Sequence, residues 1–324
     1  MNQSFPLIVV TDYTFADLTI EEKLCRAVNC ELRGAQAKTE AALIELCSEA
    51  DAVITQFAKI NANVINAMNR AKVIVRYGIG VDNVDLKAAR AKNIPVCNVP
   101  DYCIDEVADH TLAFILALTR QVVPHNDHLK AGKWGLVGPL ENLRCLRDQT
   151  VGVVGFGRIG RQVVQRLLAF KCKVVVYDPI VSADDVQQVG AEPSTFDDLL
   201  RQSDIVTLHC PSIPQTRKIM NLKSIGLMKK GAILINVGRG DLLDVPALMQ
   251  GLDSGHLSAA ALDVFDPEPI PTGHPILSRS NVVLAPHIAS ATPTASAKLR
   301  DSATGLAIKG ARGEKVSNVV NGVR

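Results

Sequence analysis

The sequence has 324 residues, the length of about two average domains, so it predicts a two-domain protein. Lysine and arginine number 35 against 33 aspartates and glutamates, and this near balance excludes a basic surface that would recruit nucleic acid or an acidic membrane. The 47% hydrophobic and 21% charged residues are typical of a globular chain and exclude a disordered one.

Four short apolar runs in the first hundred residues are separated by segments with helical spacing. The runs are residues 7–10, 52–55, 72–77 and 95–100. Strands that alternate with helices predict a parallel sheet covered on both faces. A long helix is expected next, over residues 105–120, because apolar residues recur there at a helical period.

Six more strand-like runs follow this helix, with helical patterns in most of the gaps. They are residues 151–157, 173–179, 204–211, 232–238, 260–265 and 281–287. Six such runs predict a six-stranded doubly wound sheet. Residues 316–323 are too few to form a domain and are expected to return to the first one.

The predicted fold class is therefore α/β, with two doubly wound parallel-sheet domains. A Rossmann domain of residues 101–290 is expected as an insertion into a smaller, flavodoxin-like domain made of residues 1–100 and 291–324. The crevice between two such domains is the default position for an active site.

A glycine motif, GFGRIG at residues 155–160, lies between a predicted strand and a predicted helix. In this context Gly155 permits a tight turn, Gly157 lets the backbone approach a pyrophosphate, and Gly160 lets helix and strand pack closely. Asp178 ends the next strand, where a carboxylate can accept both ribose hydroxyls and repel a 2′-phosphate. The motif therefore favours NAD over NADP, whereas an ordinary glycine turn with a solvated aspartate is the alternative.

Three polar residues follow the last predicted strands, at the edge where open α/β sheets bind ligands. Arg239 can bind a carboxylate or a 2-oxo acid with its two-pronged guanidinium. Glu268 and His287 can form an oriented acid–base pair. Each residue alone would more often be solvated, so the hypothesis depends on their shared position.

Several long strings in the sequence resemble the D-isomer-specific 2-hydroxyacid dehydrogenase family. They are GFGRIG, INVGRGDLLD, AALDVFDPEP and APHIAS, together with RYGIGVDNVD at residues 76–85 and the predicted helix at 105–120. The resemblance implies that His287 exchanges the substrate proton, that Glu268 holds its imidazole, and that Arg239 binds the substrate carboxylate and polarises the carbonyl.

The same resemblance implies further binding residues. Backbone amides of Ile79, Gly80 and Val81 would form a second carboxylate clamp, and Asp263 would hold the nicotinamide carboxamide. Arg158, Ile159, Cys210, Val237, Gly238 and Ser290 would line the cofactor. A homodimer is also implied, with the helix at residues 105–120 at or near the interface.

Departures from the family pattern narrow the expected substrate to a small 2-oxo acid such as glyoxylate or hydroxypyruvate. Longer phosphoglycerate dehydrogenases of the family continue into a regulatory domain, and they carry an Arg-Ser pair where this sequence has Thr55-Gln56-Phe57. Arg76 and Lys59 could replace the missing cation, so D-3-phosphoglycerate oxidation stays open. Relatives that act on formate carry glutamine where this chain has Glu268.

A second alternative is a non-catalytic scaffold that senses NAD. The central part of the sequence resembles the C-terminal-binding-protein corepressors, which use the same fold in this way. Partner binding that survives loss of His287 would distinguish the scaffold from the enzyme.

Other features carry weaker expectations. The N-terminal residues show no signal-peptide pattern, no apolar run reaches the roughly 18 residues of a membrane span, and eight cysteines lack zinc-type spacing. We therefore expect a cytoplasmic protein without a metal site. His110 is expected to pack in the core or at an interface, Trp134 to pack after the long helix, and Arg161 and Arg166 to face solvent.

Overall fold

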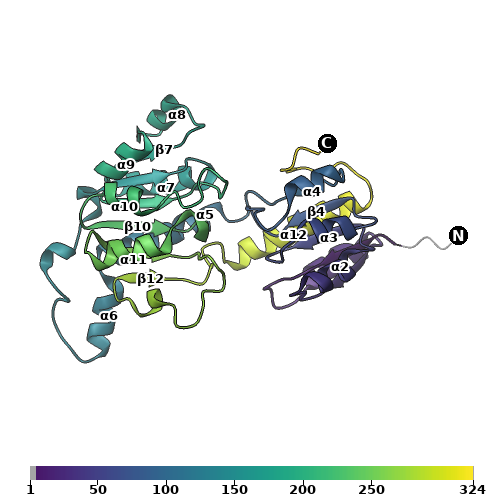
Figure 1. Cartoon of the computed structure of the whole chain (residues 1–324), viewed down its shortest axis with the longest axis horizontal. Coiled ribbons are helices and arrows are strands. Elements are labelled where there is room, and N and C mark those ends of the chain that lie inside the picture. The colour runs from purple at the N-terminus through teal and green to yellow at the C-terminus, as the bar shows by residue number, and fades with distance from the viewer. Residues whose placement is uncertain (1–4, 324) are drawn as a thin grey trace. The chain divides into compact units, whose positions relative to one another are not determined.

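The computed structural model describes residues 5–323, which divide into two compact units (Figure 1). One unit consists of residues 5–102 and 292–323, and the other is Cys103–Ala291. Each unit is built on a single parallel sheet, which confirms the predicted fold class.

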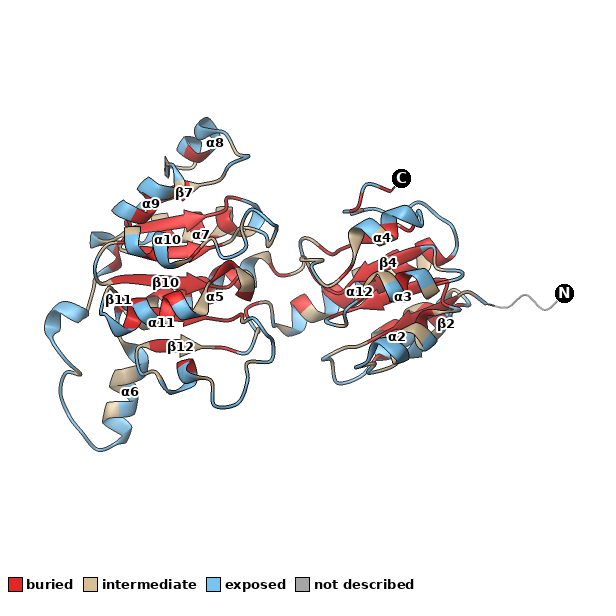
Figure 2. Ribbon diagram, viewed as in Figure 1, coloured by how far each residue is buried: buried red, intermediate tan, exposed pale blue. Residues whose placement is uncertain are grey.

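The discontinuous unit has five parallel strands in the order β2-β1-β3-β4-β5, which is the flavodoxin-like order. The strands are β1 (Leu7–Val10), β2 (Glu31–Gly34), β3 (Ala52–Thr55), β4 (Val73–Arg76) and β5 (Val96–Cys97). The helices are α1 (Thr19–Ala27), α2 (Glu40–Cys47), α3 (Ala62–Ala67), α4 (Leu86–Ala91) and α12 (Pro293–Ala311). The strands β1, β3 and β4 are entirely buried, as Figure 2 shows in red, because helices cover both faces of the sheet.

The C-terminal segment returns to this unit, as predicted. Val320 donates its backbone N–H to the carbonyl of Val96 over 2.8 Å, and the side-chain oxygen of Asn321 accepts from Val96 N over 3.1 Å. Helix α12 also lies in the core, where its Leu299, Ala303 and other small apolar residues pack against the strands.

The continuous unit has seven parallel strands in the order β12-β11-β10-β9-β6-β7-β8. They are β6 (Thr150–Val154), β7 (Lys173–Tyr177), β8 (Glu192–Pro193), β9 (Ile205–Leu208), β10 (Ala232–Asn236), β11 (Leu257–Leu262) and β12 (Val282–Leu284). The prediction of six strands is wrong by one, because β8 has two residues at the sheet edge and no apolar run to reveal it.

The helices of this unit alternate with its strands, as expected for a doubly wound fold. They are α5 (Ile104–Thr119), α6 (Val122–Lys130), α7 (Arg158–Ala169), α8 (Ala183–Gln188), α9 (Phe196–Gln202), α10 (Leu222–Leu227) and α11 (Val245–Asp253), with 3-10 turns at Leu140–Asn142, Leu146–Asp148, Gly240–Leu242 and Pro275–Ser278. The long helix predicted over 105–120 is α5. No helix in the described part of the chain is long and apolar enough to cross a membrane.

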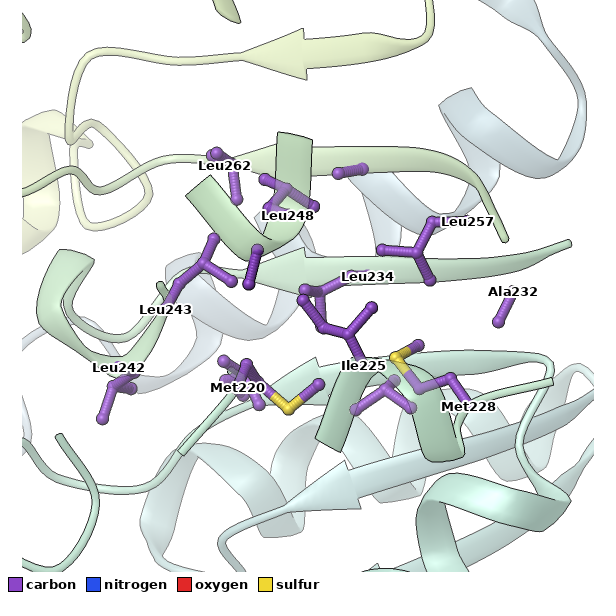
Figure 3. Close-up of a cluster of buried hydrophobic side chains, with 14 of the residues drawn as sticks. Met220, Ile225, Met228, Ala232, Leu234, Leu242, Leu243, Leu248, Leu257 and Leu262 are labelled. Atoms are coloured by element: carbon purple, nitrogen blue, oxygen red, sulfur yellow. The ribbon is translucent and has the colours of Figure 1, made fainter. Parts of the chain in front are cut away.

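The core of this unit is aliphatic, in keeping with an aromatic content of only 4%. Figure 3 shows Leu234 and Leu262 of the sheet facing Ile225 of α10 and Leu248 of α11, with Met220 beside them. Burying each large side chain of this kind contributes roughly 1.5–3 kcal/mol to stability. This packing holds the strands rigid, so that the residues at their carboxyl ends have fixed positions.

One segment of the continuous unit stands apart from its core. Helix α6 has no buried residue, and together with residues 131–139 it forms a projection that we call the arm (Figures 1 and 2). His125 braces the arm, because its ring contacts Gln121 O at 2.8 Å and accepts the N–H of Val137 at 3.2 Å. The expectation that Trp134 packs here is wrong, since it is 92% exposed.

Candidate active site

The glycine motif forms the turn between β6 and α7, and each of its three glycines has a different surrounding. Gly155 has φ +99°, and a Cβ there would lie 2.6 Å from the backbone N of Cys210. A Cβ on Gly160 would overlap the carbonyl oxygen of Gly155, whereas one on Gly157 would meet no atom within 4 Å. Only Gly157 therefore borders open space, at the N-terminus of a twelve-residue helix where a pyrophosphate can bind.

Asp178 follows β7 and is tied to this turn. One carboxylate oxygen accepts the N–H of Phe156 at 2.7 Å, and the other accepts the N–H groups of Ile180 at 2.9 Å and Val181 at 3.2 Å. The carboxylate is thus fixed beside the glycine motif, where the sequence places a ribose-binding acid. The structure adds a function that the sequence did not reveal, because Asp178 also shapes the glycine turn.

His209 and Cys210, which follow β9, lie against the glycine turn and are both uncharged. Burial lowers the pKa of His209 to about 3, and its Nε2 lies 2.9 Å from the hydroxyl of Thr207. Burial likewise raises the pKa of Cys210 to about 11, with the charges of Asp178 and Asp241 acting in the same direction. Both side chains are therefore neutral at neutral pH, which suits the binding of a cofactor more than chemistry.

His287 and Glu268 form a hydrogen-bonded pair, with 2.8 Å between Nδ1 of the imidazole and Oε2 of the carboxylate. The other carboxylate oxygen accepts the N–H of Phe265, also at 2.8 Å. Partial burial alone would raise the pKa of Glu268, but these hydrogen bonds and the charges of His287 and Arg239 outweigh it and lower the pKa below its usual 4.5. The carboxylate therefore stays ionised in neutral and mildly acidic solution, and its contribution to stability is lost only as the pH falls through the lowered value.

The backbone of His287 has φ +55°, a left-handed conformation that residues other than glycine rarely adopt. Asp263, at the end of β11, holds this turn. Its carbonyl accepts the N–H of His287 at 2.8 Å, and its two carboxylate oxygens accept those of Ile288 at 2.8 Å and Ala289 at 2.9 Å. The side chain of Asp263 is fully buried, and its carboxylate and backbone carbonyl together order three successive residues.

Arg239 follows β10 and is positioned by Asn236, a fully buried side chain that the sequence analysis missed. The Asn236 amide donates to Arg239 O at 2.8 Å and accepts from Gly238 N at 3.1 Å. Gly240 comes next, and a Cβ there would overlap the carbonyl of Phe265. The absence of a side chain at Gly240 therefore lets the loop of Arg239 approach the loop that holds Glu268.

The structure brings the predicted residues of this unit to one edge of its sheet. Arg158 and Ile159 begin α7, Val237 and Gly238 follow β10, and Ser290 completes the turn after His287. In parallel sheets this carboxyl edge is where ligands bind. Among the residues of the described chain, no three or more His, Cys, Asp or Glu side chains gather in a way that could hold a metal ion.

The predicted carboxylate clamp lies in the discontinuous unit, in the loop after β4. Asn98 fixes this loop by donating to the carbonyl of Ile79 at 2.7 Å. Within residues 5–323 no acceptor takes the backbone N–H groups of Ile79, Gly80 or Val81, and the three residues are half-buried. Three amides in sequence without a protein acceptor are suited to binding an anion.

Comparison with known proteins identifies the family. The model of the NAD-binding domain of D-isomer-specific 2-hydroxyacid dehydrogenases matches residues 112–289. The chain is 39% identical over 272 residues to the glyoxylate reductase of Thermofilum pendens, with 81% of this chain and 78% of that protein covered.

Two further matches cover almost all of this chain. It is 37% identical over 316 residues to the D-3-phosphoglycerate dehydrogenase of Methanocaldococcus jannaschii, with 97% of this chain and 59% of that protein covered. The chain thus spans little more than half the length of the phosphoglycerate dehydrogenases that it matches. The structure of D-lactate dehydrogenase from Aquifex aeolicus with NAD and lactic acid has a TM-score of 0.86 at 28% identity, over 95% of this chain and 96% of that one. The chain belongs to the D-isomer-specific 2-hydroxyacid dehydrogenase family.

Proposed function

We propose that this protein is an NAD-dependent dehydrogenase that interconverts a small D-2-hydroxy acid and its 2-oxo acid, of the glyoxylate or hydroxypyruvate type. The observation that carries the proposal is the pair of His287 and Glu268, joined over 2.8 Å. An imidazole held at Nδ1 by a carboxylate has a fixed orientation, and Nε2 becomes the nitrogen that we assign to proton transfer.

The residues around the glycine motif fit a dinucleotide. The open space at Gly157 and the N-terminus of α7 suit a pyrophosphate, and the carboxylate of Asp178 suits the ribose hydroxyls. Asp263 is assigned to the nicotinamide carboxamide by family resemblance. The bound NAD would accept or supply the two electrons of the reaction.

The chain's own residues would bind the acid and move its proton. In the direction of reduction His287 donates a proton to the carbonyl oxygen, and in oxidation it removes the proton from the hydroxyl. Arg239 binds the substrate carboxylate and polarises the carbonyl. By family resemblance, the amides of Ile79, Gly80 and Val81 are assigned to carboxylate binding as well. Glu268 stabilises the imidazole while it carries the proton.

The test is the consumption of NADH with glyoxylate, hydroxypyruvate, pyruvate and 3-phosphohydroxypyruvate, each against the His287→Ala variant. We expect turnover of an unphosphorylated acid that disappears in the variant. NADH binding without turnover of any of the four acids would contradict the proposal and favour the scaffold.

D-3-phosphoglycerate oxidation is the second candidate, favoured by Arg76 at the end of β4. This arginine is only 8% exposed, its guanidinium lies against Gly78, and its Cζ is 5.9 Å from the centre of the Phe57 ring. It is a fixed cation next to the loop of Ile79, where it could bind a phosphate. A preference for 3-phosphohydroxypyruvate in the same assay would select this candidate.

Removing the charge of Asp178 is expected to weaken the preference for NADH. In the Asp178→Asn variant the ratio of kcat/KM for NADPH to that for NADH should rise about tenfold or more, because the repulsion of the 2′-phosphate is lost. The amide oxygen can still accept the N–H of Phe156, so the glycine turn is retained, whereas the bonds from Ile180 and Val181 are lost. An unchanged ratio would remove Asp178 from ribose recognition.

We further propose that the protein is a homodimer that uses the arm. The arm carries several exposed large apolar residues, among them Val122, Leu129, Trp134 and Leu136. Several exposed apolar side chains on one segment are typical of an interface. Light scattering after size exclusion should give twice the mass of one chain, and the Trp134→Ser variant should shift the protein toward the monomer. A wild-type monomer at micromolar concentration would refute the proposal.

A further inference from the structure

His110 lies close to Asp263, the residue that holds the turn carrying His287. It belongs to α5, which packs against β11 and β10 as well as α7. Its Nε2 lies 3.8 Å from Oδ1 of Asp263, and this nitrogen is buried without a hydrogen-bond partner in the described structure. The imidazole ring packs edge-on against Phe114, with 4.4 Å between the ring centres.

The placement of this nitrogen assigns its proton. A nitrogen lone pair facing a carboxylate oxygen would be repelled, whereas an N–H in the same place is attracted. The tautomer with the proton on Nε2 is therefore the favoured one. A separation of 3.8 Å exceeds a hydrogen bond, but the attraction between a donor and a buried anion falls off slowly where water is excluded.

The contact between His110 and Asp263 affects His287, because Asp263 holds the turn that carries it. Its carboxylate is fully buried, and its two oxygens hold the N–H groups of Ile288 and Ala289. Those bonds fix the left-handed turn at His287, which would otherwise relax to a commoner conformation. A group that holds the Asp263 carboxylate in place thus also keeps the imidazole of His287 aligned.

We propose that His110 is a positioning residue that acts through Asp263 to hold His287 in the orientation that proton transfer needs. This inference rests on the proposed function, which gives His287 its part in the reaction. It goes beyond that function by adding a residue that acts on His287 through Asp263.

The helix that carries His110 is itself anchored at the cofactor-binding side. Arg166 of α7 pairs with Asp105 and Asp109 of α5, with 2.7 Å between donor and acceptor in both cases. Contacts therefore connect α7, the helix of the glycine motif, through α5 to His110 and Asp263. Helix α5 joins the two parts of the site as one rigid element.

Two substitutions at residue 110 distinguish the effect of the N–H donor from the effect of the aromatic ring. The His110→Phe variant keeps the aromatic packing on Phe114 but removes the N–H, whereas His110→Gln keeps a donor and loses the ring. Phe114→Leu serves as the control for packing. For each variant we would measure kcat, KM and NADH affinity, together with the hydrogen exchange of the amides of Ile288 and Ala289.

The donor model predicts a definite order. His110→Phe should lower kcat about 10- to 100-fold, as expected for a misaligned catalytic group, with faster exchange at the two amides. His110→Gln should keep most of the wild-type kcat and slow exchange. Phe114→Leu should change stability and leave kcat near the wild-type value.

The opposite order, with His110→Phe active and His110→Gln impaired, would show that only packing matters and would overturn the inference. Unchanged exchange in His110→Phe, or faster exchange with unchanged kcat, would overturn it as well. If the wild-type protein has no turnover, the proposed function fails, and the exchange measurement alone decides whether His110 holds the turn. The two failures are therefore distinguishable.

Discussion

Turnover in the His287→Asn variant is expected to fall about 100- to 10,000-fold, the range associated with loss of a general acid–base group. Because His287 has φ +55°, the choice of replacement matters. Asparagine adopts this left-handed conformation readily and alanine does not, so His287→Asn removes the imidazole with little added backbone strain. NADH affinity should stay close to the wild-type value, because the glycine motif and Asp178 are untouched.

The His287→Ala variant is the matched control for backbone strain. If the imidazole is the essential group, both variants lose turnover to a similar extent, measured as kcat at saturating NADH and substrate. High activity in His287→Asn combined with a defect in His287→Ala would show that the turn matters and the imidazole does not. That result would remove His287 from the proton transfer.

The second large effect is expected at Gly240, which sequence reasoning did not single out. A Cβ at this position overlaps the carbonyl of Phe265, a backbone atom that no side-chain rotation can move away. In the Gly240→Ala variant the loop of Arg239 must therefore withdraw from the loop of Glu268. We expect kcat/KM to fall about 100-fold, as a displacement of roughly 1 Å can produce. Overpacking should also lower the free energy of unfolding by about 1–3 kcal/mol.

Gly226→Ala provides the control for this substitution. Gly226 lies in α10, and a Cβ there would meet no atom within 4 Å. This variant should keep wild-type kcat/KM and gain about 0.5–1 kcal/mol in stability, because alanine favours helix. Wild-type kcat/KM in Gly240→Ala would show that the close approach to Phe265 has no part in positioning Arg239.

The buried strands could be predicted because burial on both faces leaves a plain signal in the sequence. Strands β1, β3 and β4 are largely apolar, and so are the central strands β9 and β10 of the other sheet. The edge strands lack this signal. Strand β2 (Glu31–Gly34) is mostly exposed and polar, and β8 has only two residues, so both were missed although each pairs in register with its neighbour.

The positions of Arg239, Glu268 and His287 could be predicted because each follows a strand, and parallel strands end at one edge. The residues that support them could not. Asn236 and Gly240 act through backbone atoms of loops that only the folded chain brings close. Asn236 is itself the polar residue at the end of the buried apolar strand β10, and this is the one local signal that could have found it.

Ion pairs between residues far apart in the chain could not be predicted from the sequence either. Arg166 was expected to face solvent, and this is wrong, because its guanidinium is held by Asp105 and Asp109 and its side chain is 26% exposed. Some sixty residues separate these partners along the chain. A charged residue on a helix gives no local indication of whether a neighbouring helix supplies its partner.

The position of α12 sets an order of events during synthesis. Residues 5–102 emerge from the ribosome first, but their core lacks Leu299, Ala303 and the other α12 residues until about 190 residues later. At roughly 5–20 residues per second this delay is about 10–40 s. The contiguous unit Cys103–Ala291 can meanwhile collapse on its own, while the five-stranded sheet of the first unit keeps apolar surface that α12 will later cover. The nascent chain should therefore need chaperone protection most at its N-terminal part, and slower elongation before α12 should increase aggregation.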